Sequence, residues 1–578
     1  MTMNVRQCLR ACGWTAAMML LSGVAGAASP YDLLVKGATV YDGSGEAPFV
    51  ADVAVVGDRI VAVAPSLEGP ARDVIDARGR ALAPGFINAM SHAQYSLPIH
   101  RTAESDLRQG VTLEVVGEGS TAGPLSPALL AERQRSSATN FPFEWRTLGE
   151  FFTGLERTGI SVNVTGWVGA TTVRRYVLGD DNVQPNAEQL MQMRQLVRQA
   201  MEEGALGVAS ALIYPPGVFA STEELTALAT EAGNCGGLYA SHLRSEADQF
   251  LEALDELLEI ARRSGAPATV FHIKAAGQDN WPKLAPALTK IRDARERGLR
   301  ISANMYPYVA AATGLSATVP PWVQEGGMDA FRARLKDPKI RARVIAEMQQ
   351  PTNSWENAMR DAGGPSGVVL ASFETASLQK FAGKTLADVA KAKGVSAQEA
   401  ALQLIEAEPG HLGAFYFSMS EDNLRVQLRE RYISFGSDLQ ALTVSKASGV
   451  HPRAYGTFAR VFAKYVREEK VLSVQEAVRR LTSLPAASYS IAARGWLKPG
   501  YFADLVLFDP ARIQDHATFE RPQQYATGVS DVWVNGVRVL ANGASTSARP
   551  GRFIRGRGWS GHAGGGCRAS ASDWTTSP

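Results

Sequence analysis

The sequence has little that would indicate a nucleic-acid-binding protein or a disulfide-rich scaffold. Its 59 Lys and Arg residues nearly balance 57 Asp and Glu residues, which gives a net charge of +2, and no long basic run occurs. Nucleic acid is therefore not an expected partner, and the charge balance gives no clue to the substrate. Only four cysteines occur in 578 residues, and nothing in their spacing indicates a disulfide scaffold.

Long apolar runs are also lacking, apart from a short one near the N-terminus. Arg6 and Arg10 precede an apolar stretch over residues 14–24, which Ala25-Gly26-Ala27 follows. This order is typical of a signal peptide, so we exclude residues 1–27 from the fold and expect an exported, periplasmic or secreted protein. The alternative is a membrane anchor, but the run is short for a bilayer span. After cleavage we expect no membrane association.

Removal of the signal peptide would also remove Cys8 and Cys12. Cys235 and Cys567 then remain, one in the body of the chain and one in a Gly-rich tail. In an oxidising compartment these two could pair.

The remaining chain is long enough for a large catalytic domain and a smaller satellite. Hydrophobic residues make up 45% and charged residues 20%, which is typical of a globular protein. Both ends read as short strands: residues 33–35 and 39–41 flank Lys36-Gly37, and residues 53–56 and 60–63 flank Gly57-Asp58. Residues 503–508 and 532–537 have the same character. We expect one small β-sandwich domain from both termini, over residues 28–81 and 491–556.

Between these ends, apolar strand-like runs alternate with helical patterns. One predicted helix presents an apolar face, and another begins with a capping box from Ser221 to Glu224. The alternation predicts a (β/α)8 TIM-like barrel over residues 82–490, with its catalytic groups at the carboxyl ends of the strands. The apolar face comprises Leu190, Met193, Leu196, Val197 and Ala200. The predicted strands end near Met90, Gly119, Gly169, Tyr214, His242, His272, Tyr308 and Asp438.

Two regions do not fit the alternation. The gap from Tyr308 to Ile433 is too long for one crossover, so we expect an inserted subdomain over about residues 310–430. Residues 557–578 are rich in Gly and Ser, which predicts a disordered tail.

Histidine is scarce, with eight residues, and two of them end consecutive predicted strands. His242 and His272 would therefore lie at the same rim of the barrel, where two neutral imidazoles can bind one zinc ion. The alternative is two unrelated histidines that bond to backbone. Asp438 ends the last predicted strand, where a carboxylate can take a proton from a metal-held water and pass it to a leaving nitrogen. Its alternative role is a helix N-cap.

Eight short motifs stand out along the chain, between residues 84 and 504. They are Pro84-Gly85-Phe86-Ile87, Gly110-Val111-Thr112, Ser241-His242-Leu243-Arg244-Ser245-Glu246, His272-Ile273-Lys274-Ala275-Ala276-Gly277, Tyr306-Pro307-Tyr308, Gly436-Ser437-Asp438, His451-Pro452-Arg453 and Pro499-Gly500-Tyr501-Phe502-Ala503-Asp504. Together and in this order they resemble the N-acyl-D-amino-acid deacylases of the amidohydrolase superfamily, and the likeness extends from about residue 31 to residue 555.

The resemblance implies roles for individual residues. His242 and His272 match zinc-binding histidines, and Asp438 matches the catalytic aspartate. Lys274 and Arg453 match positions that hold the substrate carboxylate, for which Arg offers a bidentate fork and Lys a point charge; without the resemblance both could be solvated surface residues. Tyr214 matches another substrate contact, and its alternative role is simple packing.

The sequence departs from the family pattern on the side of the first strands. The family carries Asp and then His-x-His after the first strand, where this chain has Asn88, Met90 and His92, and a thioether is a poor ligand for zinc. The family cysteine after the second strand is also missing. Glu118, next to that position, could replace it as a ligand if the backbone shifts, or could be a carboxylate with another partner. Asn304 stands where a family aspartate is frequent.

These departures argue against a binuclear centre. We expect one zinc ion held by His242, His272 and Glu118, with His92 as a further candidate ligand. The expected activity is hydrolysis of the amide bond of a small N-acylated amino acid. Cyclic-amide and dipeptide hydrolysis share the fold and stay open, as does an amidohydrolase-like protein that binds a ligand without turning it over.

Overall fold

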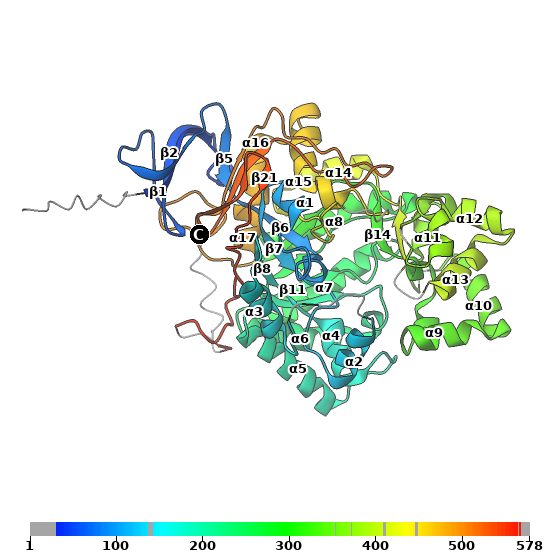
Figure 1. Ribbon diagram of the computed structural model, residues 1–578. Coiled ribbons are helices and arrows are strands. Elements are labelled where there is room, and N and C mark those ends of the chain that lie inside the picture. The colour runs from blue at the N-terminus through cyan, green and yellow to red at the C-terminus, as the bar shows by residue number, and fades with distance from the viewer. Residues whose placement is uncertain are drawn as a thin grey trace, which may run out of the picture.

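The computed structural model describes residues 31–563 and 566–567, except 137–140, 142, 353, 372, 409–411 and 445–448. The predicted signal peptide at residues 1–27 lies outside the described residues. Three regions are seen: a β-rich domain, a barrel in the middle and an insertion at the opposite side (Figure 1). Among the described residues, no helix has both the length and the apolar character that a membrane crossing needs.

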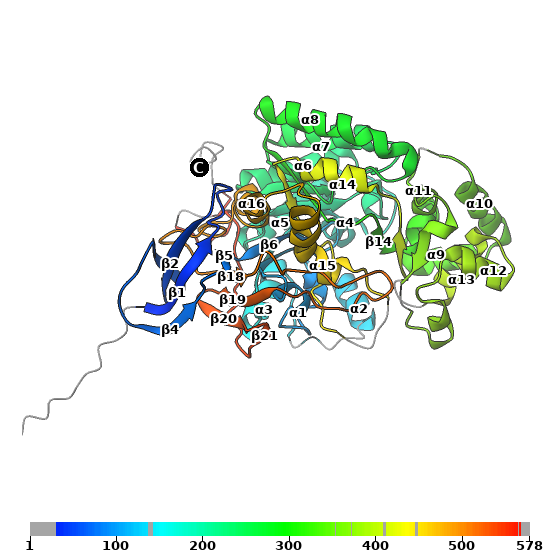
Figure 2. The ribbon, with the colours of Figure 1, turned by 90° about the horizontal axis from the view of Figure 1, so that it is seen from above.

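The β-rich domain is built from both ends of the chain, as predicted. Its strands form one nine-stranded sheet in the order β21-β20-β19-β18-β5-β1-β2-β3, with β4 paired to β1. Figure 2 shows the early and late strands side by side. The junction is the antiparallel pair β5–β18, in which Leu82 faces Leu507. The strands are β1 (Tyr31–Val40), β2 (Phe49–Val56), β3 (Arg59–Ala64), β4 (Ala71–Asp76), β5 (Ala81–Pro84), β18 (Leu505–Phe508), β19 (Val529–Val534), β20 (Val537–Ala541) and β21 (Ala544–Ser545).

One strand prediction in this domain was wrong. Residues 33–35 and 39–41 were predicted as two short strands, but residues 31–40 form the single strand β1. Its pairing with β2 shifts register between Val35 and Ala38, and Gly37 has a φ of +68°. Lys36-Gly37 is therefore a β-bulge and not a turn, because glycine accepts the positive φ that a bulge can require. The predicted hairpin around Gly57-Asp58 is confirmed by the antiparallel pair of β2 and β3.

The middle of the chain forms the predicted eight-stranded barrel of parallel strands. The third barrel strand consists of two short pieces, of which β8 pairs with β7 and β9 pairs with β10. The barrel closes between the last and first strands, where the backbone N–H of Asp438 donates to Met90 O at 2.9 Å. The strands are β6 (Phe86–Ser91), β7 (Val111–Val116), β8 (Asn163–Gly166), β9 (Val168–Gly169), β10 (Gly207–Ala211), β11 (Leu238–His242), β12 (Ala268–Val270), β13 (Ile301–Met305) and β17 (Ile433–Phe435).

Helices cover the outside of this barrel because each buries one apolar face against the strands. On α5 (Ala187–Glu202) the residues Met193, Val197 and Ala200 of the predicted face are buried. The capping box at the start of α6 (Thr222–Asn234) is present only in part: Ser221 accepts from Glu224 N, but Glu224 bonds Arg174 instead of the Ser221 backbone. The other covering helices include α3 (Leu148–Thr158), α4 (Ala170–Leu178), α7 (Phe250–Ser264), α8 (Leu284–Glu296), α14 (Glu421–Leu428), α15 (Arg453–Arg460) and α16 (Val474–Leu481).

The insertion between β13 and β17 has a hydrophobic core of its own. A three-stranded antiparallel sheet, β14-β16-β15, faces the barrel, and the helices lie beyond it (Figures 1 and 2). The elements are β14 (Ala311–Gly314), α9 (Gly327–Leu335), α10 (Pro338–Gln349), α11 (Ala358–Asp361), β15 (Val368–Leu370), α12 (Leu386–Lys393), α13 (Ala397–Ala407) and β16 (Gly413–Tyr416).

The C-terminal segment returns to the barrel surface. The backbone N–H of Ser560 donates to Glu202 O at 2.9 Å, and Cys567 forms a disulfide with Cys235 at the end of α6. The rest of the predicted disordered tail, residues 564–565 and 568–578, lies outside the described residues.

Candidate active site

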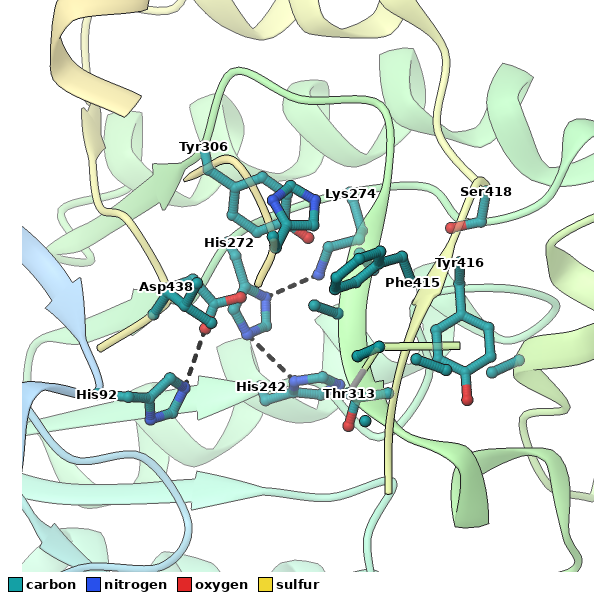
Figure 3. A pocket seen from close by; sticks show the side chains of 18 of the residues that line it. His92, His242, His272, Lys274, Tyr306, Thr313, Phe415, Tyr416, Ser418 and Asp438 are labelled. Atoms are coloured by element: carbon teal, nitrogen blue, oxygen red, sulfur yellow. Dashed lines mark hydrogen bonds and ion pairs between the residues drawn. The ribbon is translucent and has the colours of Figure 1, made fainter. Parts of the chain in front are cut away.

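A cavity of about 460 Å³ lies at the carboxyl ends of the barrel strands. The histidines, Lys274 and Asp438 come from the barrel side, whereas Thr313, Phe415 and Tyr416 come from the insertion (Figure 3). The cavity therefore lies where catalytic groups of such barrels are found, and the insertion forms one of its walls.

Three predicted ligands meet at one point of this cavity. Glu118 Oε1 lies 3.2 Å from His242 Nδ1 and 3.1 Å from His272 Nε2, and these two nitrogens are 3.2 Å apart. Zinc bonds of about 2.0–2.2 Å in a tetrahedral site put neighbouring donor atoms roughly 3.3–3.6 Å apart. Two nitrogens and one carboxylate oxygen at nearly this spacing fit a zinc ion. Glu118 thus reaches the ligand position although it is offset by one residue from the missing cysteine.

The charges of these groups depend on one another. Burial alone would raise the pKa of the Glu118 carboxyl, but the bonds from His242 and His272 hold it well below its ordinary value. Burial and Lys274 disfavour a charged His272, yet the carboxylates of Asp438, Glu246 and Glu118 together raise the pKa of His272 to about 9. The site therefore attracts a positive charge at the point where the three donor atoms meet.

Glu246 lies behind both histidines and was not predicted as a site residue. Its Oε1 is 3.1 Å from His272 Nδ1, and its Oε2 is 3.5 Å from His242 Nε2. A carboxylate in this position orients an imidazole and raises its basicity toward a metal on the other nitrogen. Glu246 lies four residues after His242 and ends the motif that begins at Ser241. Its place in that motif was the signal from which its role at the site could have been predicted.

Two residues of the site have strained backbones. The φ angles of His272 and Asp438 are +30° and +50°, a region that non-glycine residues rarely adopt. The side chain of Asn304 accepts from the backbone N–H of His272 at 2.6 Å, and Asn88 accepts from Ser437 N at 2.9 Å. These two asparagines thus hold the turns that carry a candidate metal ligand and the candidate catalytic residue.

Asp438 lines the cavity between a histidine and an arginine. Its Oδ1 lies 3.1 Å from His92 Nε2, and its Oδ2 lies 2.9 Å from Arg453 Nη2. Burial opposes ionisation, but Arg453, His272 and His92 hold the pKa of the Asp438 carboxyl well below its usual range. Asp438 is therefore a carboxylate at neutral pH. His92 faces Asp438 and is not among the three residues whose donor atoms meet.

Two of the three predicted substrate-binding residues, Tyr214 and Lys274, line the same cavity, whereas Arg453 is not among the residues that line it. Lys274 is buried, with Nζ 2.5 Å from Glu246 Oε1 and 2.9 Å from His272 Nδ1. Arg453 is also buried, and its Nε and Nη1 have no hydrogen-bond partner. The Tyr214 ring lies 5.3 Å from the His242 ring and lines the cavity. Both cations are thus already paired with site carboxylates, although Arg453 keeps donors to spare.

Met90, near the end of the first barrel strand, belongs to an apolar cluster and not to the three candidate ligands. Met90 is 1% exposed and packs with Ile87, Leu113 and Trp167 in an apolar cluster. Among the described residues, only Glu118, His242 and His272 form a group that could hold a metal ion.

Comparison with known proteins shows the family of the chain. Residues 73–540 match the Amidohydrolase family. The chain is 31% identical to D-aminoacylase of Alcaligenes xylosoxydans xylosoxydans, over 91% of this chain and 98% of that protein. It is 32% identical to N-acyl-D-glutamate deacylase of the same organism, over 91% and 96% respectively.

A solved structure has the same fold. The N-acyl-D-glutamate deacylase of Bordetella bronchiseptica, in complex with zinc and a phosphonate that mimics the tetrahedral intermediate, superposes with a TM-score of 0.74. The identity is 29%, and the match covers 91% of this chain and 99% of that structure.

Proposed function

The chain belongs to the amidohydrolase family, and we propose that it is a zinc-dependent deacylase that cleaves the amide bond of N-acyl-D-amino acids or related acyl-amino compounds. The observation that carries this proposal is the cavity that joins three metal-ligand candidates to an ionised aspartate. A protein that binds a small molecule without turning it over would have no need for an ionised aspartate beside the three candidate metal ligands.

We propose a single zinc ion held by Glu118, His242 and His272. Two imidazoles and a carboxylate leave a fourth position open, which is the usual arrangement of catalytic zinc. When bound, the ion supplies Lewis acidity that polarises the scissile carbonyl and makes a water nucleophilic near neutral pH. We propose one ion and not two because Met90 packs in an apolar cluster, and because the described part of the chain has no second group of candidate metal ligands.

The protein groups around that position divide the remaining work. The Asp438 carboxylate accepts the proton of the attacking water and delivers it to the leaving nitrogen, while His92 and Arg453 keep it ionised and oriented. Lys274 and Tyr214, which line the cavity, bind the carboxylate of the substrate. Arg453 lies outside the cavity lining, so its unpartnered Nε and Nη1 can join them only by a side-chain movement. Glu246 positions both histidines.

A direct test is to measure metal content and hydrolysis together. We expect about one zinc per chain by inductively coupled plasma mass spectrometry, and release of amine from a panel of N-acetyl-D-amino acids but not from their L-enantiomers. Chelation should remove activity, and zinc should restore it. Zinc well below one per chain that cannot be restored, with no hydrolysis across the panel, would instead favour the non-catalytic ligand-binding protein.

We also propose that the protein is exported and that the Cys235–Cys567 disulfide forms after export. Disulfides form and persist in oxidising compartments, and the N-terminal pattern is typical of a signal peptide. In protein from a periplasmic fraction, the mature chain should begin at Ala28, and a non-reduced digest should contain the two cysteine peptides linked. A Cys567→Ser variant is the control. An unprocessed N-terminus together with free Cys235 would contradict this proposal.

A further inference from the structure

The wall that the insertion adds to the cavity is acidic. Glu356, which comes just before α11, and Asp361, the last residue of α11, both line the cavity. Oε2 of Glu356 accepts from the backbone N–H of Glu246 at 2.6 Å. This bond joins the wall to the segment that positions the two histidines, so the acidic groups belong to the same cavity as the proposed zinc site.

Few positive groups balance these carboxylates. Lys274 is the one Lys or Arg that lines the cavity among the described residues, and it is paired with Glu246. Within the same part of the chain no ion pair involves Glu356. Arg360 lies 3.6 Å from Asp361 but bonds Asp248 more closely, and it is one-third exposed. The wall is therefore short of positive charge.

Asp361 shows this shortage most clearly. The residue is 7% exposed, and its Oδ2 has no hydrogen-bond partner. Burial, together with Glu356, raises the pKa of the Asp361 carboxyl to about 8, and burial raises the pKa of Glu356 as well. A buried carboxyl oxygen without a partner costs free energy, and a bound cation would remove that cost.

We propose that the substrate carries, besides the carboxylate assigned to Lys274, a cationic nitrogen that binds to Glu356 and Asp361. This inference rests on the proposed deacylase function and specifies its substrate class. An ammonium or guanidinium could come from the side chain of a basic D-amino acid, or from the free amino group of an aminoacyl residue in a dipeptide. Both sources present the same chemistry to the wall.

The acidic wall also distinguishes between two substrate preferences that sequence identity alone does not distinguish. The chain is 31% identical to D-aminoacylase and 32% identical to N-acyl-D-glutamate deacylase, so identity favours neither. A second carboxylate on the substrate would lie against Glu356 and Asp361, where the described cavity lining offers it no Lys or Arg besides Lys274, and it would repel either carboxyl in its ionised form. We therefore expect N-acetyl-D-glutamate to be a poor substrate.

The test compares substrates that differ in one charged group, using the zinc-loaded protein. N-acetyl-D-lysine is paired with N-acetyl-D-norleucine, which lacks the terminal nitrogen, and glycyl-D-norleucine places an ammonium in the acyl part. We expect kcat/KM for at least one cationic substrate to exceed that of N-acetyl-D-norleucine by about tenfold or more, with N-acetyl-D-glutamate the poorest. The cationic substrate that gains identifies the source of the nitrogen.

Isosteric variants connect this preference to the wall. Glu356→Gln and Asp361→Asn should each lower the ratio of kcat/KM for the cationic substrate to kcat/KM for N-acetyl-D-norleucine by about tenfold, because an amide of nearly the same shape cannot ionise beside a bound cation. Glu374→Gln, an exposed glutamate of the same insertion, is the matched control and should leave this ratio unchanged.

Several outcomes would overturn the inference: no preference for either cationic substrate, a preference for N-acetyl-D-glutamate, or a preference that survives both variants. If the zinc-loaded protein hydrolyses no acyl compound, the proposed function fails separately. Calorimetry with the unhydrolysed compounds N-acetyl-D-lysine, N-acetyl-D-norleucine and glycyl-D-norleucine as ligands then still decides the inference. Tighter binding of a cationic ligand that Glu356→Gln abolishes supports it, and equal binding of the three rejects it.

Discussion

An Asp438→Asn enzyme is expected to retain about one zinc per chain and to lose kcat by about a thousandfold. The amide keeps the size of the carboxylate but cannot accept the proton of water, and positioned proton transfer contributes about 10²–10⁴-fold to rate. The loss should fall on kcat more than on KM, since the proposed ligands and the carboxylate-binding groups are unchanged. Steady-state kinetics together with metal analysis of the same preparation measure both quantities.

A companion variant distinguishes the two roles open to His92, which are a partner of Asp438 and a zinc ligand. Because His92 Nε2 lies 3.1 Å from Asp438 and apart from the three donor atoms that meet, His92→Gln should keep its zinc and lose only about tenfold in kcat. Loss of zinc in His92→Gln would make His92 a ligand. Full activity of Asp438→Asn would remove Asp438 from the mechanism.

A His272→Ala chain is expected to contain almost no zinc and to have no measurable deacylase activity. His272 provides one of three protein donors, and His242 and Glu118 alone would leave two. Bound metal stabilises a fold by mass action, so chelation should lower the melting temperature of the wild type by several degrees. Chelation should leave the melting temperature of His272→Ala unchanged, which calorimetry or a dye-based thermal scan can measure.

The matched control is His516→Ala, since His516 is exposed and its ring contacts Thr527 far along the chain from the site. That variant should bind zinc and respond to chelation as the wild type does. Stoichiometric zinc in His272→Ala would show that the ligand assignment is wrong.

Much of the scaffold follows from local pattern. The ends of β11 and β12 could be predicted because continuous apolar runs stop at His242 and close to His272, and parallel strands share one rim. The position of the Glu118 side chain was harder to predict. A one-residue offset along β7 decides whether a side chain points into the barrel, and this depends on how Gly117, with its φ of +100°, turns the chain.

Other features depend on contacts between distant segments. Glu224 was predicted to bond back to the start of its own helix, but the buried guanidinium of Arg174 competes for it, and a charge-assisted bond in the interior is the stronger of the two. The same reasoning applies to Glu356. No motif marks it, because its role comes from the packing of the insertion over the barrel mouth.

The pairing of β5 with β18 also has a consequence for how the molecule forms. The strands β1 to β5 are synthesised early, but β18, which pairs with β5 in the sheet, is made only after the whole barrel and the insertion. The edge of β5 must therefore stay open through most of synthesis, and an unpaired edge is a site for aggregation. The domain that begins the chain is the last to be completed, so a protein truncated before residue 505 should aggregate although every ligand and catalytic residue discussed above is present.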